Sequence, residues 1–199
     1  MNARVFPGHP VPPASFTDCF VLPEGVDEGR NAGARALWVA APERPFTDGG
    51  GKSLRWIAPA TQGDALPDAW SLDDDAAVPA DHRPLLVAGR LTPLRIASLL
   101  KARPGPVVLR HLGAGAGDAA ALVAVLQLAA SDPRLWLETS GAVIGAFVTE
   151  AAARLPDRVI FASGAPVFEA HAQAAHVAAA LSPDAARGVF VDNAARLMP

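Results

Sequence analysis

Two stretches near the C-terminus decide the fold of this chain: DRVIFASGAP at residues 157–166 and LSPDAARGVFVDNAARLM at residues 181–198. In the first, a short apolar run ends in a turn of small residues, which is typical of a buried strand. In the second, Ser182 suits a helix N-cap, Pro183 the first helical position and Asp184 the first turn. The chain is therefore expected to end with a strand followed by a capped closing helix.

The same alternation of apolar runs and helical patterns extends towards the N-terminus and predicts a parallel α/β sheet. Strands are predicted at residues 3–6, 36–40, 54–58, 69–72, 85–88, 106–111, 135–139 and 158–163. Helices are predicted at residues 92–103, 118–131, 142–155, 170–181 and 183–197. Residues 1–84 are irregular and rich in Pro and Gly, so helices there are expected to be short or missing. We predict one domain, residues 1–199, in which residues 85–199 form regular strand–helix units.

Composition excludes several classes of protein. Of the 199 residues, 51% are hydrophobic and 19% charged, which fits strands buried on both faces. The net charge of −3 and the scattered arginines argue against a nucleic-acid surface. The apolar runs are shorter than a membrane span, and prolines between residues 7 and 13 break any signal peptide. The single cysteine, Cys19, excludes an internal disulfide, so we expect a cytoplasmic protein without nucleic-acid or membrane partners.

The motifs after residue 84 resemble those of the amidohydrolase-related (amidohydrolase 2-like) metal-dependent hydrolases. PLLVAGR (84–90), PVVLRHLG (106–113), LWLETSG (135–141) and DRVIFASGAP (157–166) occur in the order of that family's strands five to eight. The resemblance implies a small, distorted or incomplete TIM (β/α)8 barrel. The length is near the lower limit for such a barrel and indicates a short member with a trimmed N-terminal half.

The resemblance also implies a metal site, and the matching positions of this chain lack its ligands. Active relatives carry a His-x-His pair on strand one, where the nearest match, NARVFPGHP, has Asn2 and Arg4. Ala88 stands where strand five usually ends in a metal-binding histidine, and Gly164 where strand eight carries an aspartate. A divalent metal such as zinc would have too few ligands, so we predict no cofactor and no metal.

One expected polar position is kept, because His111 matches the family's sixth-strand histidine, which in relatives activates water or polarises the substrate. By strand alternation, Val107, Leu109 and His111 are predicted to share the interior face of the barrel. Two interpretations of His111 are open. It is either a core histidine hydrogen-bonded to the next turn or a pocket histidine that acts as an acid, a base or a ligand.

Glu138 ends the neighbouring predicted strand and needs a partner such as His111 or Arg110, since an unpaired buried carboxylate is costly. A pair of His111 and Glu138 would suit general acid–base catalysis, and a structural ion pair is the alternative. An arginine could clamp a substrate carboxylate by bidentate pairing. The residues predicted to bind a small anionic molecule are Arg4, His9, Arg90, Ser140 and Ser163.

A glycine-rich motif, GAGAGD at residues 113–118, provides a rival interpretation. It follows a predicted strand, opens a helix and fits a relaxed G-x-G-x-x-A pattern. Glu138, at the end of the next strand, stands about where a dinucleotide-binding fold has its ribose-binding acid. Only one further strand follows, which argues against that fold. The glycines could still bind an anionic group in a barrel, because they expose backbone amides at a helix start.

The sequence thus leaves three functions open. The first is a pseudoenzyme, a barrel that has lost its metal site and serves as a non-catalytic or regulatory subunit. The second is a hydrolase or decarboxylase of a small carboxylic acid, with a reduced or metal-free site around His111 and Glu138. The third is a dinucleotide binder that uses residues 113–118. The missing ligands favour the first slightly. A trimmed half would leave strand edges and apolar patches uncovered, which predicts a homodimer or a partner subunit.

Overall fold

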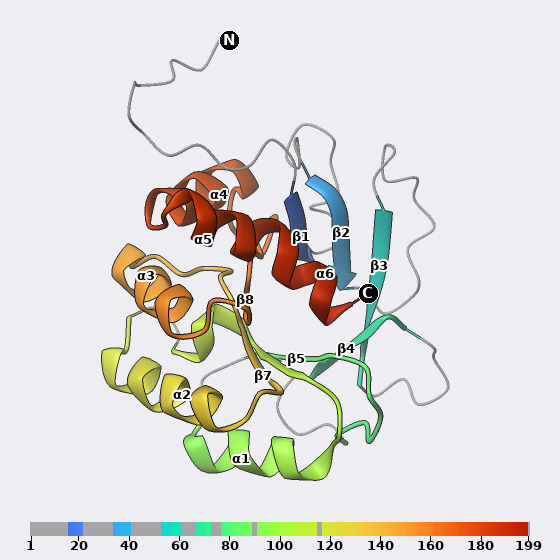
Figure 1. Ribbon diagram of the computed structural model, residues 1–199. Coiled ribbons are helices and arrows are strands. Elements are labelled where there is room, and N and C mark those ends of the chain that lie inside the picture. Colours follow the sequence, from blue (N-terminus) through green and yellow to red (C-terminus); the bar gives the residue numbers. More distant parts are fainter. Residues whose placement is uncertain are drawn as a thin grey trace, which may run out of the picture.

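The computed structural model describes residues 16–21, 34–40, 53–60, 67–72, 77–88, 91–114 and 117–198 (Figure 1). Within them, eight strands form a single sheet in which the spatial order follows the sequence and all neighbours are parallel. The strands are β1 Phe16–Val21, β2 Ala34–Ala40, β3 Ser53–Pro59, β4 Ala69–Leu72, β5 Leu85–Val87, β6 Val107–Leu109, β7 Leu135–Glu138 and β8 Val159–Ile160. The predicted α/β class with a parallel sheet is confirmed, and an incomplete barrel describes it.

Among the described residues, helices follow the strands from β5 onwards. They are α1 Pro93–Ala102, α2 Ala119–Ser131, α3 Gly145–Arg154, α4 Ala170–Ala179, α5 Pro183–Arg187 and α6 Asn193–Leu197. In Figure 1, α1, α2 and α3 lie side by side along one flank of the sheet. The described residues between β1 and β5 contain no helix. None of the described helices is long and apolar enough to cross a membrane.

The first strand of the described sheet was not predicted from the sequence pattern. The predicted strand at residues 3–6 falls outside the described residues, and β1 runs over FTDCFV at residues 16–21. Asp18 and Cys19 of this strand are fully buried. An aspartate interrupts the apolar run, so no local pattern marked this segment as a strand; the sheet accommodates it by supplying the carboxylate with a partner.

The buried residues form two apolar layers. Ile57, Leu86, Val108, Trp136 and Ile160, from β3 and β5 to β8, pack together in one cluster. Neighbouring residues of the same strands pack in a second cluster, which contains the buried side chains of α1 to α4. The first cluster is therefore the interior of the incomplete barrel, and the second joins the sheet to its helices.

The first and last strands meet through isolated hydrogen bonds instead of a ladder. The Cys19 amide donates to the Phe161 carbonyl, just beyond β8, at 3.0 Å. The Asp18 carboxylate accepts a hydrogen bond from the Ser163 amide at 2.8 Å. These two contacts bring the edges of the sheet together and leave the barrel incompletely paired at this seam.

The closing helix is interrupted at its middle, although the sequence predicted one helix over residues 183–197. Ser182 caps α5 as predicted, but Gly188–Asp192 form a wider π-helical turn before α6. Within this turn the Val189 carbonyl accepts a hydrogen bond from the Phe161 amide at 2.9 Å. The rings of Phe190 and Phe161 stack with centroids 4.5 Å apart. Contacts with the end of β8, which a helical pattern does not reveal, account for the interruption.

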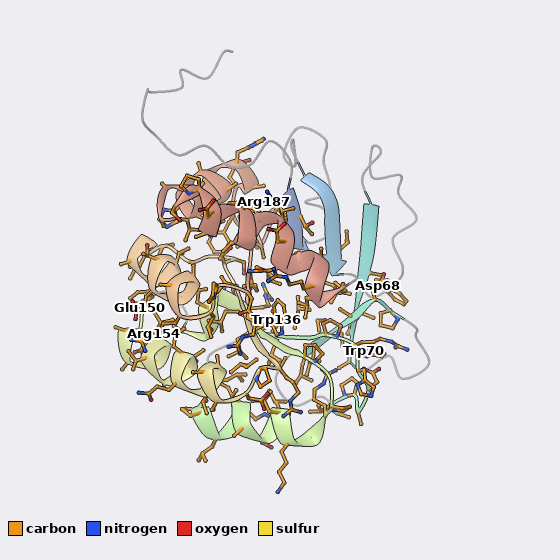
Figure 2. All side chains as sticks on the ribbon, viewed as in Figure 1. Asp68, Trp70, Trp136, Glu150, Arg154 and Arg187 are labelled. Carbon is orange, nitrogen blue, oxygen red and sulfur yellow. The ribbon has the colours of Figure 1, made fainter. Side chains whose placement is uncertain are left out.

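The anchoring of α6 can be tested at Asn193, whose buried side-chain amide donates to the carbonyls of Pro156 at 3.0 Å and Val159 at 2.8 Å. Asn193→Ala leaves both carbonyls without this donor and should lower the free energy of unfolding by about 2 kcal/mol. Arg187→Ala removes an exposed ion pair with Asp192 (3.3 Å; Figure 2) and should cost less than about 1 kcal/mol. Urea denaturation measures both variants, and equal losses would contradict the anchoring role.

Candidate functional site

Polar side chains from three loops meet at the carboxyl ends of β6, β7 and β8. In parallel barrels this edge carries the catalytic residues. His111 follows β6, Ser140 follows β7, and Ser163 follows β8, while Glu138 is the last residue of β7. Glu138, Ser140 and Ser163 are fully buried. The structure therefore brings the two predicted catalytic residues and the two predicted binding serines to one edge of the sheet.

The loop after β6 begins with a left-handed turn. The backbone φ is 55° at His111, 56° at Leu112 and 68° at Gly113. For the two residues with a side chain this conformation costs about 1–2 kcal/mol each. Two interactions hold it: Leu112 is buried in the core, and the His111 amide donates a hydrogen bond to Glu138 Oε1 at 3.1 Å. The turn thus depends on a carboxylate from the adjacent strand.

This turn makes the predicted orientation of His111 wrong. Val107 and Leu109 pack in the cluster that faces the helices, whereas Val108 lies in the barrel interior. The strand ends at Leu109, so His111 does not continue the alternation of its neighbours. Side-chain alternation with a period of two applies only to residues inside a strand. It cannot predict a turn that is stabilised by a residue of another strand.

Glu138 is the centre of the polar network. Its Oε1 accepts hydrogen bonds from the Ser140 hydroxyl at 2.6 Å and the His111 amide at 3.1 Å. Its Oε2 accepts one from the Ser140 amide at 2.6 Å. The Arg110 Nε lies 3.6 Å from Oε1 and supplies the compensating positive charge. Both partners expected from the sequence, Arg110 and His111, are therefore present, the latter through its main chain.

The imidazole of His111 contacts Ser140, whereas the hydrogen bond of His111 to Glu138 comes from its main-chain amide. Its Nδ1 lies 2.6 Å from the Ser140 carbonyl oxygen and 3.1 Å from the Ser140 hydroxyl. The ring is half-buried, so one edge is held while part of the side chain reaches solvent. The hydrogen bonds to the turn after β7 agree with the core interpretation, and a role of His111 as an acid, a base or a ligand stays a prediction.

Ser163 belongs to a second cluster that includes β1. Its amide donates to the Asp18 carboxylate, and its hydroxyl accepts a hydrogen bond from the Ala165 amide at 3.1 Å. Asp18 and Ser163 are both fully buried. The Ser163 hydroxyl thus stabilises the turn after β8, and its contact with substrate stays a prediction.

Cys19 lies in the barrel interior between the two carboxylates. Burial raises the pKa of its thiol well above the usual value, and the negative charges of Asp18 and Glu138 raise that pKa further. The thiolate is the form that attacks electrophiles and binds metals. Cys19 is therefore a protonated packing residue at neutral pH.

Phe168, in the loop after β8, packs against Gly141 and Gly164. These glycines have φ values of 61° and 70°. A Cβ on Gly141 would lie 2.8 Å from Phe168 Cζ and 3.2 Å from His111 Nδ1; one on Gly164 would lie 3.1 Å from Ser140 Cβ and 3.2 Å from Phe168 Cδ2. A side chain at position 164 would be strained by the positive φ and would need Ser140 or Phe168 to shift by a few tenths of an ångström. Sequence reasoning missed Phe168 because a lone aromatic residue in a loop belongs to no periodic pattern.

The described residues do not provide the ligands for the metal ion that the resemblance implies. Gly164 occupies the place of the expected aspartate, and β1, FTDCFV, contains no histidine. The oxygens of Glu138 are engaged by hydrogen bonds and by Arg110. Across the part of the chain that the structure describes, no group of three or more His, Cys, Asp or Glu side chains is placed to hold a metal ion.

Three predicted binding residues, Arg4, His9 and Arg90, lie outside the described residues, as do Gly115 and Ala116 of the glycine-rich motif. The strand order β1 to β8 contains no reversal, whereas a dinucleotide-binding sheet reverses its order at the binding crevice. The fold is therefore not of the dinucleotide-binding type. Asp118 caps α2 by accepting a hydrogen bond from the Ala121 amide at 3.0 Å.

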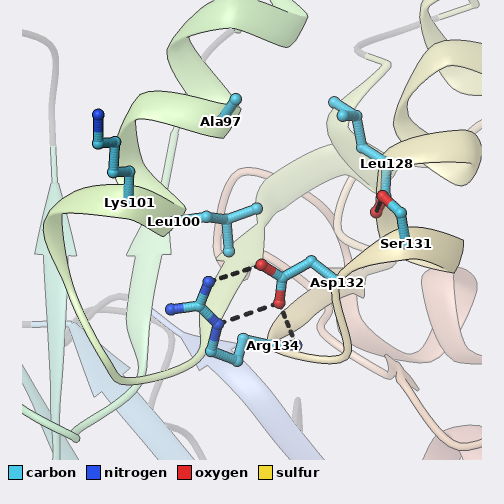
Figure 3. Close-up of a pocket in the computed structure, with 7 residues that line it drawn as sticks. All are labelled: Ala97, Leu100, Lys101, Leu128, Ser131, Asp132 and Arg134. Atoms are coloured by element: carbon cyan, nitrogen blue, oxygen red, sulfur yellow. Dashed lines mark hydrogen bonds and ion pairs between the residues drawn. The ribbon is translucent and has the colours of Figure 1, made fainter.

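A pocket of about 330 Å³ lies near the opposite end of the strands, beside the residue that precedes β7 (Figure 3). It is bordered by the ends of α1 and α2 and contains an ion pair between Arg134 Nη2 and Asp132 Oδ2 at 2.6 Å. The hydrogen bond from Arg134 lowers the pKa of Asp132, and the same bond raises the pKa of Arg134. Its lining residues are Ala97, Leu100, Lys101, Leu128, Ser131, Asp132 and Arg134. None of the predicted site residues lines this pocket.

Comparisons with known proteins agree with the architecture. A family model described as amidohydrolase matches residues 86–199. No curated protein sequence matches the chain significantly. A crystal structure of an Agrobacterium tumefaciens protein in its apo form is similar at 14% identity, with a TM-score of 0.64, and the match covers 95% of this chain and 97% of that one.

Two further similar structures are of proteins whose names state an activity. One is 2,6-dihydroxybenzoate decarboxylase complexed with 2,6-dihydroxybenzoate, with 13% identity, a TM-score of 0.54 and coverage of 92% of this chain and 99% of that chain. The other is described as a 2-pyrone-4,6-dicarboxylic acid hydrolase from Pseudomonas putida, with 15% identity, a TM-score of 0.50 and coverage of 89% and 80%. At these identities the similarity shows the fold.

The central role of the Glu138 carboxylate can be tested by Glu138→Ala. The substitution removes the acceptor of two buried amides and a hydroxyl and leaves Arg110 without this carboxylate, so the free energy of unfolding should fall by about 3–5 kcal/mol. Glu150→Ala is the matched control, because Glu150 pairs with Arg154 on the exposed face of α3 (2.6 Å; Figure 2). The control should cost about 0.5 kcal/mol. Chemical denaturation measures both, and similar losses would contradict the role of Glu138.

The state of Cys19 can be tested by alkylation. We expect iodoacetamide at pH 8 to leave the thiol of the folded protein unmodified and to modify it in urea, because burial and the raised pKa both deplete the thiolate. Since this pKa is higher in the folded chain, the associated stability is complete below the usual thiol pKa of about 8.5 and is lost as the pH rises above it. Mass spectrometry measures labelling, and rapid modification of the folded protein would contradict the prediction.

Proposed function

Because this chain belongs to the amidohydrolase family, we propose that it binds a small carboxylic acid at the carboxyl ends of β6 to β8. We further propose that His111 moves a proton during hydrolysis or decarboxylation of that acid. One observation carries the proposal: the imidazole of His111 is hydrogen-bonded to Ser140 and held in a strained turn by Glu138, at the edge where such barrels carry their catalytic groups.

The chemistry needs a positioned proton carrier. An imidazole changes its charge near neutral pH and can act as a base or as an acid. In hydrolysis His111 would accept a proton from the attacking water. In decarboxylation it would donate a proton to the carbon that loses carbon dioxide. Either step requires the ring to stay within hydrogen-bond distance of the reacting group, and the contacts with Ser140 restrict the ring in this way.

The backbone of His111 supports a functional role independently. A left-handed non-glycine residue costs about 1–3 kcal/mol and persists where the surrounding structure imposes it, commonly at active sites. Glycine would adopt the φ of 55° without this cost. A histidine in this backbone conformation is consistent with a requirement for its side chain.

The surroundings of His111 favour an acid with an apolar body. Arg110 lies beside the site with its charge balanced by Glu138, so the carboxylic acid is proposed on the comparisons. Val143, Ile144 and Val167, in the loops after β7 and β8, are exposed and supply apolar surface. Two structurally similar proteins are described as acting on ring compounds with carboxylic acid groups, namely 2,6-dihydroxybenzoate and 2-pyrone-4,6-dicarboxylic acid. These compounds are therefore the first to assay.

A non-catalytic role is the second candidate, and the geometry at Gly164 favours it. An aspartate at this position would contact Ser140 and Phe168 tightly and would need a strained positive φ, and the glycine present supplies no metal ligand. In this case the barrel would serve as a binding or regulatory subunit, paired with a second copy or with a partner protein. The two candidates differ in whether a bound acid is turned over.

His111→Asn tests the catalytic proposal. Asparagine tolerates left-handed backbone better than most residues, so the variant should fold while lacking an imidazole. Turnover of 2,6-dihydroxybenzoate, 2-pyrone-4,6-dicarboxylate or a related acid should fall by about 100-fold or more, the usual contribution of a general acid or base. Product formation is followed by liquid chromatography, with binding measured in parallel by calorimetry.

Arg154→Ala, on the exposed face of α3, is the control and should retain full activity. Equal activity in His111→Asn and the unmodified protein would refute the role of His111. Binding without turnover across the tested acids would favour the non-catalytic candidate over the enzyme.

A further inference from the structure

We infer that Ser140 is a positioning residue that determines which ring nitrogen of His111 takes part in the chemistry. The inference rests on the proposed function of His111 and deepens it. Sequence analysis placed Ser140 among the substrate-binding residues. In the structure Ser140 is fully buried, and its amide, carbonyl and hydroxyl groups all contact Glu138 or His111.

The carbonyl of Ser140 gives the first argument for the state of the ring. Nδ1 of His111 lies 2.6 Å from this oxygen. A carbonyl oxygen can only accept a hydrogen bond, so Nδ1 must be the donor and carry the hydrogen. In the neutral imidazole Nε2 then holds the lone pair. Nε2 is therefore the nitrogen that can accept a proton from water or substrate.

The hydroxyl of Ser140 gives a second, independent argument. It lies 2.6 Å from Glu138 Oε1, and an ionised carboxylate only accepts, so the hydroxyl hydrogen points to Glu138. The hydroxyl can then offer only a lone pair to His111 Nδ1, 3.1 Å away. Both oxygens of Ser140 thus require the same tautomer. The direction of the hydroxyl bonds follows from the charge of Glu138, and that of the carbonyl bond follows from the carbonyl itself.

The arrangement also has a consequence for the protonated ring. When Nε2 takes up a proton, the positive imidazolium keeps its Nδ1 hydrogen bond to Ser140. The Ser140 hydroxyl links that ring to the negative carboxylate of Glu138 without a rearrangement of the chain. Ser140 therefore acts on the reaction through His111. With its hydroxyl hydrogen directed to Glu138 and its side chain buried, it is neither a nucleophile nor a substrate contact.

The tautomer can be measured directly by two-bond proton–nitrogen correlation spectra of the uniformly ¹⁵N-labelled, full-length protein. The spectrum distinguishes the two neutral tautomers of each histidine from the cross-peaks of the ring protons. His111 is assigned by the loss of its signals in His111→Asn. We expect His111 to carry its hydrogen on Nδ1 at a pH where the ring is neutral. A hydrogen on Nε2, or an averaged mixture of the tautomers, overturns the inference.

Ser140→Ala removes the hydroxyl and leaves the carbonyl, so it distinguishes the contributions of these two groups. The Nδ1 hydrogen should exchange with water about fivefold faster or more, as expected for the loss of one hydrogen bond of ordinary strength. Ser140→Thr keeps a hydroxyl and should restore slow exchange. Ser131→Ala, whose hydroxyl bonds only within α2, is the matched control and should exchange at the wild-type rate. Wild-type exchange in Ser140→Ala would overturn the role of the hydroxyl.

These measurements are separate from the test of the proposed function. If a carboxylic acid is turned over, Ser140→Ala should lower kcat while KM stays unchanged, because the residue acts on the ring and not on the bound acid. An equal rise in KM would instead make Ser140 a binding residue and refute the inference. If no acid is turned over, the proposed function fails, whereas the tautomer and the exchange rate still decide the role of Ser140.

Discussion

The buried carboxylate of Glu138 is the interaction on which the site depends. It accepts hydrogen bonds from the main chain of two loops, at His111 and Ser140, and is neutralised by Arg110. A buried charge is tolerated only with such partners, and its partners are in turn fixed by it. The left-handed turn at His111, the orientation of the ring and the direction of the Ser140 hydroxyl all follow from this one group.

The sheet shows a similar dependence on a few contacts. Seven parallel pairings follow the chain, but β1 and β8 are joined by isolated bonds, one from the Cys19 amide and one to the Asp18 carboxylate. The π-helical turn at Gly188–Asp192 packs against the end of β8 at this seam. At the seam between β1 and β8, where few backbone hydrogen bonds join the strands, side chains and the π-helical turn thus cover the interior of the incomplete barrel.

The turn after β8 is held mainly by packing. Gly164 adopts a left-handed conformation, and a Cβ on it would lie 3.2 Å from the Phe168 ring. The hydrogen bonds to Glu138 come instead from the loops after β6 and β7. The polar network around Glu138 therefore does not include position 164.

The sequence by itself determined the parallel α/β class, the C-terminal helical segments, the cap at Ser182 and the need of Glu138 for a partner such as Arg110. Periodicity, capping chemistry and the cost of an unpaired buried charge are local or general properties. Tertiary structure alone decided the position of β1, the interruption of the closing helix and the orientation of His111. Each of these depends on a partner distant in the chain: Ser163 for Asp18, Phe161 for Val189, and Glu138 for His111. Such contacts leave no periodic trace in the sequence.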